Sequence, residues 1–412
     1  MTHRKNQTFH LGSVFLGCLS LALASCAPRL FKDNSRATDV RSGSTNSPST
    51  KTIVSTKEER AKYLKEADVW MKSDIASKDA AVGPEGYRGF KFGETINCRY
   101  VEPEKEDVGG RTPKFYCDKP DGERIKVKYG VDNGEVYSEV ASSRLLWTLG
   151  FGADAMYSVR VVCDNCPADP HFYGNHFGTK PSRTEVDRYT AASARSVRTF
   201  VPAAVEDKFK AIKIETLEDQ GWGWNELMNF EGVSRERVAH REALALLMSI
   251  LQHPDNKPEN QRLVCPKDGI SMTDDGRKIC SKPFALVQDF GWNFSGGWMA
   301  NDPMTIRKMD LASWSTTRVW ADERSCLTNL NGLPPIFTGS FERPRIHEAG
   351  RAFLASLLNQ LTERQMRDIF VAARVELYAY IRLPDAAETV VDKWVAALKQ
   401  KISEVNAVRC PE

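Results

Sequence analysis

The segment HPDNKPEN, at 253–260, follows the apolar run ALALLMSIL, at 243–251, with only Gln252 between them. The apolar run belongs to a helix that we expect at 235–251, because the pattern there is helical. Two interpretations of the polar segment remain open. It is either a loop that carries catalytic side chains, or a plain helix end at which Pro258 stops the helix.

Three further groups occur in a fixed order around this segment. Lys128 lies late in the expected strand RIKVKYG, and Glu139 lies in an expected helix that ends at Gly150. Downstream, LVQDFGW contains the triplet Asp289-Phe290-Gly291. Each group alone has an ordinary explanation: a solvated strand lysine, a charge on a helix surface, or a turn after an aromatic residue. Their ordered occurrence within 128–291 favours one shared site.

HPDNKPEN resembles the catalytic loop of the protein kinases, whose family form is His-Arg-Asp-Leu-Lys-Pro-Glu-Asn. Six of the eight positions match: His253, Asp255, Lys257, Pro258, Glu259 and Asn260. Asp289-Phe290-Gly291 likewise resembles the metal-binding DFG triplet of that family. The resemblance implies a two-lobed α+β fold and transfer of a phosphoryl group from Mg-ATP.

The resemblance also implies a role for each matched residue. Asp255 accepts or orients the proton of the acceptor hydroxyl, and Lys257 lies over the transferred group. Asn260 and Asp289 offer hard oxygen ligands, which suit Mg²⁺. Lys128 holds the α- and β-phosphates of the nucleotide and is steadied by an ion pair with Glu139.

The sequence also departs from the usual kinase pattern. No GxGxxG precedes Lys128; in its place stands VGGRTPKFYC, at 108–117, which resembles the phosphate-side loop of HipA-type bacterial kinases. Gly109 and Gly110 can let backbone N–H groups approach a phosphate, although a plain hairpin turn explains them equally well. No Ala-Pro-Glu follows the DFG triplet. The resemblance is therefore to the atypical, HipA-like or secreted branch of the superfamily.

Periodicity and composition predict the organisation of the chain. We expect a helix from Thr56, which forms a capping-box pattern with Glu59, and strands such as YSVRVVC and FKAIKIE between 86 and 214. After 226 the pattern is largely helical. These features predict a strand-rich N-lobe at 56–225 and a helical C-lobe at 226–412. A hinge is expected at 215–223, with Trp222 or Trp224 either covering a base or filling the domain border.

The N-terminus has the features of a targeting segment. Arg4 and Lys5 precede an apolar stretch from Leu11 to Ala24, which is typical of a secretory signal. Leu23-Ala24-Ser25-Cys26 resembles the lipobox of bacterial lipoproteins, so we expect lipidation at Cys26 and a signal peptide at 1–26; an ordinary cleaved or uncleaved signal is the alternative. Residues 27–55 are rich in Ser and Thr, which predicts a flexible stalk. The predicted location is the bacterial envelope. Ala27, rather than Asp, follows Cys26, and by resemblance to enterobacterial sorting rules this indicates the outer membrane.

Charge and cysteine content agree with export. The first 26 residues contain two basic and no acidic residues, so the remainder carries a net charge of +1, against +3 for the whole chain. Such a balance argues against broad binding to nucleic acid. Eight cysteines follow Cys26, an even number that fits disulfides outside the cytoplasm. The sequence does not fix a unique pairing, but nearness favours the pairs Cys98 with Cys117 and Cys265 with Cys280. A pair of Cys326 with Cys410 would then attach the C-terminus.

The remaining two cysteines have two possible roles. Cys163, Cys166, His171 and His176 have a C-x2-C-x4-H-x4-H spacing, which resembles a zinc knuckle and suits tetrahedral Zn²⁺. The alternative, favoured in an oxidising compartment, is either a disulfide between Cys163 and Cys166 or two separate bridges, with both histidines on an exposed loop.

The sequence therefore predicts an exported, lipid-anchored kinase-like enzyme that transfers a phosphoryl group from Mg-ATP to a hydroxyl, with Ser or Thr of a protein as the expected acceptor. The alternative is a catalytically silent pseudokinase that acts as a binding scaffold at the cell envelope. Pseudokinases usually lack at least one of the charged positions. Here Lys128, Glu139, Asp255, Asn260 and Asp289 are all present.

Overall fold

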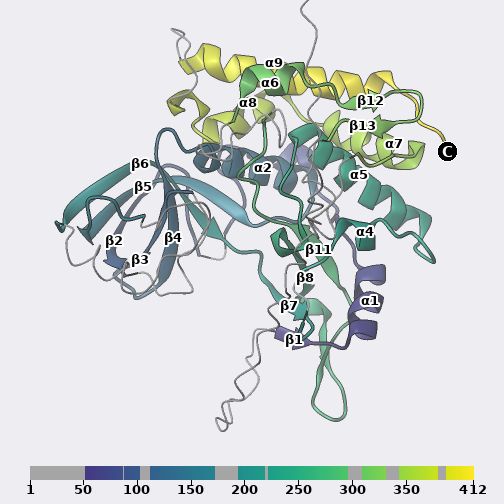
Figure 1. The fold of residues 1–412 in the computed structure, drawn as a ribbon, viewed down its shortest axis with the longest axis horizontal. Coiled ribbons are helices and arrows are strands. Elements are labelled where there is room, and N and C mark those ends of the chain that lie inside the picture. The colour runs from purple at the N-terminus through teal and green to yellow at the C-terminus, as the bar shows by residue number, and fades with distance from the viewer. Residues whose placement is uncertain are drawn as a thin grey trace, which may run out of the picture. The chain divides into compact units, whose positions relative to one another are not determined.

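A computed structural model describes residues 52–86, 88–102, 112–171, 194–218, 221–295, 309–330, 343–378 and 387–412. Both helices and strands are present, as the predicted α+β class requires (Figure 1). The predicted signal peptide, Cys26 and most of the predicted stalk lie outside the described residues. The predicted domain boundaries and the lipid anchor therefore stay predictions.

Five strands form a closed barrel in the order β2-β3-β4-β6-β5. They are β2 (Thr95–Val101), β3 (Lys114–Asp118), β4 (Arg124–Tyr129), β5 (Ala155–Cys166) and β6 (Ser196–Asp207). Side chains alternate between the two faces of each strand, so Phe115, Ile125 and Val127 fill the barrel interior. Lys128 consequently lies on the opposite face of β4 from Val127.

A second sheet has the order β1-β7-β8-β11. Its strands are β1 (Thr52–Val54), β7 (Ala211–Glu215), β8 (Gln261–Pro266) and β11 (Phe284–Val287). β1 runs parallel to β7, whereas β7 with β8 and β8 with β11 are antiparallel. Between β8 and β11 a small hairpin, β9 (Ile270–Met272) with β10 (Lys278–Cys280), extends from the sheet (Figure 1).

The connection between the barrel and this sheet is shorter and earlier than the sequence predicts. β6 ends at Asp207 and β7 begins at Ala211, so only residues 208–210 cross from one to the other. The expected hinge at 215–223 is therefore misplaced, because the strand FKAIKIE belongs to the second sheet rather than to the barrel. Trp222 and Trp224 are fully buried with ring centroids 5.0 Å apart, which confirms their role in packing.

The three helices whose positions the sequence predicts are present where they were expected. α1 (Lys57–Glu66) starts with the predicted capping box of Thr56 and Glu59, and α2 (Glu135–Leu149) ends at Gly150, whose φ of 91° is left-handed. α5 (Arg235–Leu251) has the predicted bounds and is capped by Ser234. The remaining helices are α4 (Trp224–Leu227), α6 (Leu311–Thr316), α7 (Glu348–Leu358), α8 (Glu363–Ala372) and α9 (Ala387–Ala407).

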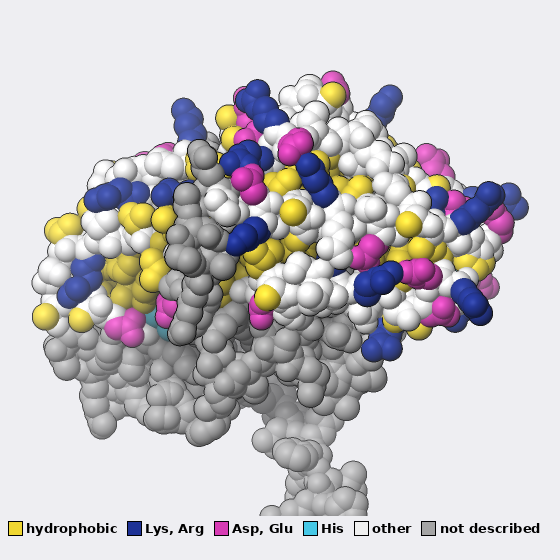
Figure 2. Space-filling view, turned by 90° about the horizontal axis from the view of Figure 1, so that it is seen from above, with side chains coloured by type: hydrophobic (Ala, Val, Ile, Leu, Met, Phe, Trp, Pro, Cys, Tyr) yellow, Lys and Arg dark blue, Asp and Glu magenta, His cyan; other side chains and the backbone are white. Residues whose placement is uncertain are grey.

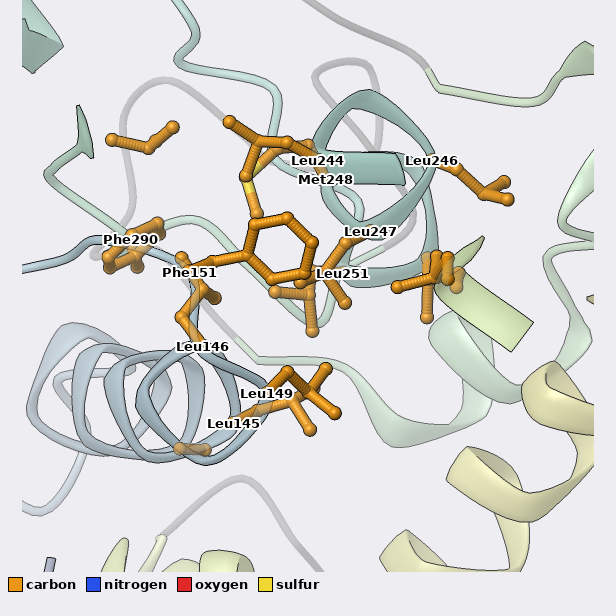
Figure 3. Packing of buried hydrophobic residues seen from close by; sticks show 14 of the residues in the cluster. Leu145, Leu146, Leu149, Phe151, Leu244, Leu246, Leu247, Met248, Leu251 and Phe290 are labelled. Atoms are coloured by element: carbon orange, nitrogen blue, oxygen red, sulfur yellow. The ribbon is translucent and has the colours of Figure 1, made fainter. Parts of the chain in front are cut away.

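The main hydrophobic core joins α2 to α5. Phe151, just after α2, lies among Leu146 and Leu149 of α2 and Leu247 and Leu251 of α5 (Figure 3). All of these side chains are at most 2% exposed. α9 packs along α6, α7 and α8, as Figure 1 shows, and closes the helical part of the same core. This packing fixes α2 relative to the segment that follows α5.

Four disulfides connect the eight cysteines that follow Cys26. Cys98–Cys117, Cys265–Cys280 and Cys326–Cys410 confirm the three predicted pairs, and the fourth joins Cys163 to Cys166. Cys265–Cys280 closes the base of the β9–β10 hairpin, which lies between Asn260 and Asp289. Cys326–Cys410 attaches the C-terminus to the short β12 (Trp320–Asp322) and β13 (Leu327–Thr328) pair.

Positively and negatively charged side chains lie next to one another on the surface. On the face shown in Figure 2, Lys and Arg side chains are interspersed with Asp and Glu. This mixture agrees with the near-neutral balance of the sequence. Among the described residues, no helix is both long and apolar enough to cross a bilayer.

Candidate active site

Lys128 lies at the centre of a buried ion-pair cluster. Its ammonium is 2.8 Å from Oε2 of Glu135 and also pairs with Oε1 of Glu139. Burial disfavours the charged ammonium, but the two carboxylates outweigh burial and raise the pKa of Lys128 well above its usual value. The predicted ion pair of Lys128 with Glu139 is therefore present, with a second carboxylate added to it.

Glu139 is held in this position by α2. Its side chain is nearly inaccessible, and burial together with the carboxylate of Glu135 raises its pKa to about 8. One lysine cannot fully offset two carboxylates, which is why the pKa stays high despite the ion pair. Oε2 of Glu139 is buried and has no hydrogen-bond partner in the described part of the chain.

Glu135 is a site residue that the sequence did not reveal. It stands one helical turn before Glu139 on the same face of α2, and it accepts a hydrogen bond from the Thr112 hydroxyl. Gly291 passes so close that a Cβ there would lie 2.5 Å from Cγ of Glu135. The i, i+4 spacing to Glu139 was the available signal, but acidic residues in the first turn of a helix are common and not informative alone.

The segment 253–260 is both a helix end and an ordered polar loop. α5 ends at Leu251, and Pro258 opens a short 3-10 turn, Pro258–Asn260. Asp255 is 4% exposed, and its Oδ1 accepts from the Lys257 ammonium at 2.6 Å. Asn260 Nδ2 donates to the backbone carbonyl of Asp255 at 2.7 Å. The loop therefore fixes Asp255 and Asn260 relative to each other.

Asp289 follows β11 and is tied to this loop. The backbone N–H of Gln288 donates to the carbonyl of Asn260 at 2.8 Å. Asp289 has a φ of 57°, a left-handed conformation that Asp tolerates better than most residues. On its other side, Ser138 of α2 donates to the carbonyl of Gly291 at 3.0 Å. These bonds fix the DFG triplet between the polar loop and α2.

Asn293 adds a further tie between the same elements. Its Oδ1 contacts Nδ1 of His253 at 2.9 Å, and its Nδ2 donates to the Ser142 hydroxyl of α2 at 2.8 Å. The His253 ring also packs 5.6 Å from the Phe290 ring. His253 therefore helps to fix the positions of Asn293 and Phe290.

Four of the predicted residues line one cavity of about 200 Å³: Lys128, Glu139, Asn260 and Asp289. They come from β4, α2, the 3-10 turn after α5 and the end of β11. Glu135 and Thr112 line it as well. Asp255 and Lys257 are not part of its wall, although Asn260 connects them to it. Gly109 and Gly110 lie outside the described residues.

The cavity contains a group of ligands that suits a hard cation. One carboxylate oxygen from each of Glu135, Glu139 and Asp289 lies within 4.8 Å of the other two. The unpartnered buried Oε2 of Glu139 is a polar atom that a cation at this position can satisfy. Oxygen ligands of this kind fit Mg²⁺. Of the predicted pair, Asp289 therefore belongs to a set that includes both glutamates of α2, and Asn260 lines the same cavity.

A larger cavity of about 650 Å³ adjoins the first one. Lys126, Glu206, Lys208, Arg262 and Gln288 line both. The rest of the wall combines charged side chains with apolar ones, namely Phe209 of the crossover at 208–210 and Ile212, Val264 and Leu286 of the second sheet. A cavity with an apolar patch that opens into a charged cavity suits a ligand with a flat apolar part and an anionic tail.

The predicted zinc alternative is contradicted. Cys163 and Cys166 are joined by a disulfide, so neither sulfur is a thiolate that can bind zinc. His171 instead contacts the backbone carbonyl of Lys114 through Nδ1, and His176 lies outside the described residues. The disulfide, the alternative favoured for an exported chain, is the one that forms.

Comparisons with known proteins give only distant likenesses. No family model matches the chain, and no curated protein matches it. Among solved structures, the proinflammatory kinase CtkA of Helicobacter pylori aligns with a TM-score of 0.36 at 10% identity, covering 76% of this chain and 97% of that one. The Golgi casein kinase aligns with a TM-score of 0.30 at 11% identity, covering 89% and 93%. Both neighbours are kinases, but likenesses at this level establish neither family nor function.

Proposed function

We propose that this protein is an exported kinase-like phosphotransferase that moves a phosphoryl group from Mg-ATP to a hydroxyl, with protein Ser or Thr as the acceptor. One observation carries the proposal. Lys128, Glu139, Asn260 and Asp289 come from four separate elements and line one cavity. Had Lys128 been remote from Asp289, with no cavity between them, the proposal would have had no basis.

The two adjoining cavities suit the two parts of a nucleotide. The apolar walls around Val264 and Leu286 accept a base, and the charged chamber beside Lys128 accepts phosphates. Glu135, Glu139, Asn260 and Asp289 are the residues that would hold magnesium. Magnesium, when bound, offsets phosphate charge and orients the terminal phosphoryl group. The barrel and the helical part would then form the two lobes of a kinase-like fold.

Asp255 is the residue proposed to act on the acceptor. Its carboxylate accepts or orients the hydroxyl proton while the new bond between oxygen and phosphorus forms and the bond to the leaving diphosphate breaks. The Lys257 ammonium, 2.6 Å from Oδ1 of Asp255, is placed to lie beside the transferred group. Asp255 is not part of the wall of the 200 Å³ cavity, which agrees with a role on the acceptor side.

Export and anchoring are supported by different features. The four disulfides agree with an oxidising compartment. The lipobox-like sequence before Cys26 supports a lipid anchor, and Ala27 supports the outer membrane of a bacterial envelope. Lipidation at Cys26 would hold the protein at the membrane without a spanning helix.

One observation favours the alternative of a silent scaffold. The Lys128 ammonium is enclosed by two carboxylates, and its side chain is 8% exposed. A lysine so enclosed contributes little net positive charge to a phosphate. A binding scaffold would keep this cluster for its structural value alone.

Turnover separates the two candidates. We expect the wild-type chain to release ADP from Mg-ATP, and the variant Asp255→Asn to bind Mg-ATP as tightly but turn it over at least about a hundredfold more slowly, since it lacks the orienting carboxylate. Binding without turnover in the wild type would support the scaffold. Equal turnover in both proteins would remove Asp255 from the mechanism.

A further inference from the structure

A second lysine faces the same cavity as Lys128. Lys114 of β3 pairs directly with Lys128 of β4 in the antiparallel ladder, so both side chains lie on the same face of the barrel wall. Both line the 200 Å³ cavity with Asp289. Like charges placed directly opposite each other in a ladder are unfavourable unless something compensates them.

Carboxylates pair with the ammonium groups of the neighbouring lysines, but none in the described part of the chain pairs with that of Lys114. Lys128 pairs with Glu135 and Glu139, and Lys126 pairs with Glu206 at 3.0 Å. Within the part of the chain that the structure describes, no carboxylate lies within ion-pair distance of the Lys114 ammonium. Burial and the adjacent charge of Lys128 lower the pKa of Lys114, as expected for an ammonium short of anions.

The charge on Lys114 is therefore available to a ligand, whereas that on Lys128 is largely taken by α2. An anion in the cavity would relieve the repulsion between the two lysines and replace the water lost by Lys114. A polyphosphate chain has the charge and the oxygen acceptors to do so. Lys128 would then mainly position Glu135 and Glu139.

We propose that Lys114 is the lysine that contributes most of the contact with the phosphates of the bound donor. This inference deepens the proposed function, because it assigns the phosphate contact within the same cavity. It is nevertheless independent of turnover, since it requires only that a polyphosphate bind there.

Lysine labelling tests the inference without any need for catalysis. The full chain is treated with an amine-reactive reagent, with and without magnesium and inorganic tripolyphosphate, and each lysine is followed by mass spectrometry. We expect tripolyphosphate to protect Lys114 at least about tenfold. Lys119, which pairs with Glu123 and lines neither cavity, should show no change. Equal labelling of Lys114 at all probe concentrations would overturn the proposal.

Variants give an independent measurement. Lys114→Gln should weaken binding of Mg-ATP by roughly tenfold to a hundredfold, the usual effect of losing a charge-assisted hydrogen bond, whereas Lys114→Arg should restore most of it. Lys119→Gln is the matched control and should bind as the wild type does. Binding of Mg-ATP unaffected by Lys114→Gln would overturn the proposal and leave the proposed function standing. Protection of Lys114 by tripolyphosphate without turnover of Mg-ATP would support the lysine assignment and count against the kinase.

Discussion

At the scale of single residues, the site depends on one lysine shared by two carboxylates. Lys128 is 6% exposed, and Glu135 and Glu139 are 3% and 4% exposed. Buried charges are stable only when they are paired, so the ammonium of Lys128 favours the ionised form of both carboxylates, whereas the two carboxylates disfavour ionisation of each other. Removing Lys128 leaves both carboxylates without their cation and with the full cost of burial.

Lys128→Met should therefore be strongly destabilising. We expect it to lower the free energy of unfolding by about 3–5 kcal/mol, because it leaves two buried carboxylates unpaired. Adding Glu135→Gln and Glu139→Gln to the same chain should recover part of that loss. Guanidinium unfolding followed by tryptophan fluorescence measures both changes. A loss below about 1 kcal/mol in the single variant would mean that the cluster is hydrated.

Asp154 makes a pH-dependent contribution to stability. Its Oδ1 accepts from the backbone N–H of Phe209 in the crossover, and its other oxygen accepts from Gln288, the neighbour of Asp289. Burial and then the charge of Glu206 raise its pKa from 3.8 to about 6, against the opposing effect of Lys208. Because the folded-state pKa is the higher one, this contribution is complete below pH 3.8 and is lost as the pH rises through about 6.

The variant Asp154→Asn tests whether the contribution of Asp154 to stability falls as the pH rises. The amide stays neutral, so between pH 4 and pH 7 the wild type should lose up to about 3 kcal/mol of stability relative to the variant. Unfolding measured across that range in both proteins gives the difference directly. If the free energy of unfolding changed with pH in the same way in the wild type and in Asp154→Asn, the raised pKa of Asp154 would be contradicted.

Motif and spacing could predict some of the site residues but not all. Lys128, Glu139, Asn260 and Asp289 could be identified because each has a fixed place in a known order. Glu135 could not, since its role depends on how closely Gly291 and Thr112 approach it in space. Lys114 was equally hidden, because the register of β3 on β4 sets which lysine it faces.

At the scale of elements, the position of α2 determines whether the site forms. Phe151 packs between α2 and α5 and is 2% exposed (Figure 3). The contact fixes the helix that carries Glu135 and Glu139 against the helix that leads into the polar loop. Packing remote from the cavity therefore controls its geometry.

Phe151→Ala should weaken both stability and the site. We expect a loss of about 3–5 kcal/mol in the free energy of unfolding from the cavity that the change leaves. Leu217→Ala is the matched control, since Leu217 is 93% exposed and should change stability by less than about 0.5 kcal/mol. Thermal or guanidinium unfolding of both variants makes the comparison. If Phe151→Ala were as stable as Leu217→Ala, Phe151 would not be what holds α2 against α5.

The helices could be predicted from the sequence far better than the sheets. α5 has the predicted bounds because a cap at Ser234 and a long apolar stripe mark it locally. The crossover at 208–210 could not be located, because alternation in FKAIKIE identifies a strand but not the sheet that it joins. The closed barrel could not be predicted from the sequence either, since closure depends on β5 pairing with both β2 and β6.

At the scale of the whole molecule, one disulfide connects segments that are far apart in the sequence. Cys326–Cys410 spans 84 residues, whereas Cys265–Cys280 spans 15. Closing the longer loop removes more conformational entropy from the unfolded chain. The nearness of the cysteines in sequence predicted two of the four pairs, Cys98 with Cys117 and Cys265 with Cys280. The pair of Cys326 with Cys410 followed from these two, and export favoured the pair of Cys163 with Cys166.

The proposed function requires that elements from the barrel and from the helical part form one site for a metal-bound nucleotide. Asp289 is the residue most directly committed to that role, since its carboxylate lies in the cavity with Glu135 and Glu139. Its removal should affect binding more than folding, because Asp289 is exposed.

Calorimetric titration of the full chain with ATP, with and without magnesium, measures this claim most directly. We predict that the wild type binds ATP in a magnesium-dependent manner, that Asp289→Asn lowers the affinity by at least about tenfold, and that the exposed hairpin variant Asp275→Asn binds as the wild type does. All three proteins should unfold at similar temperatures. No binding by the folded wild type, or equal binding by Asp289→Asn, would contradict the account.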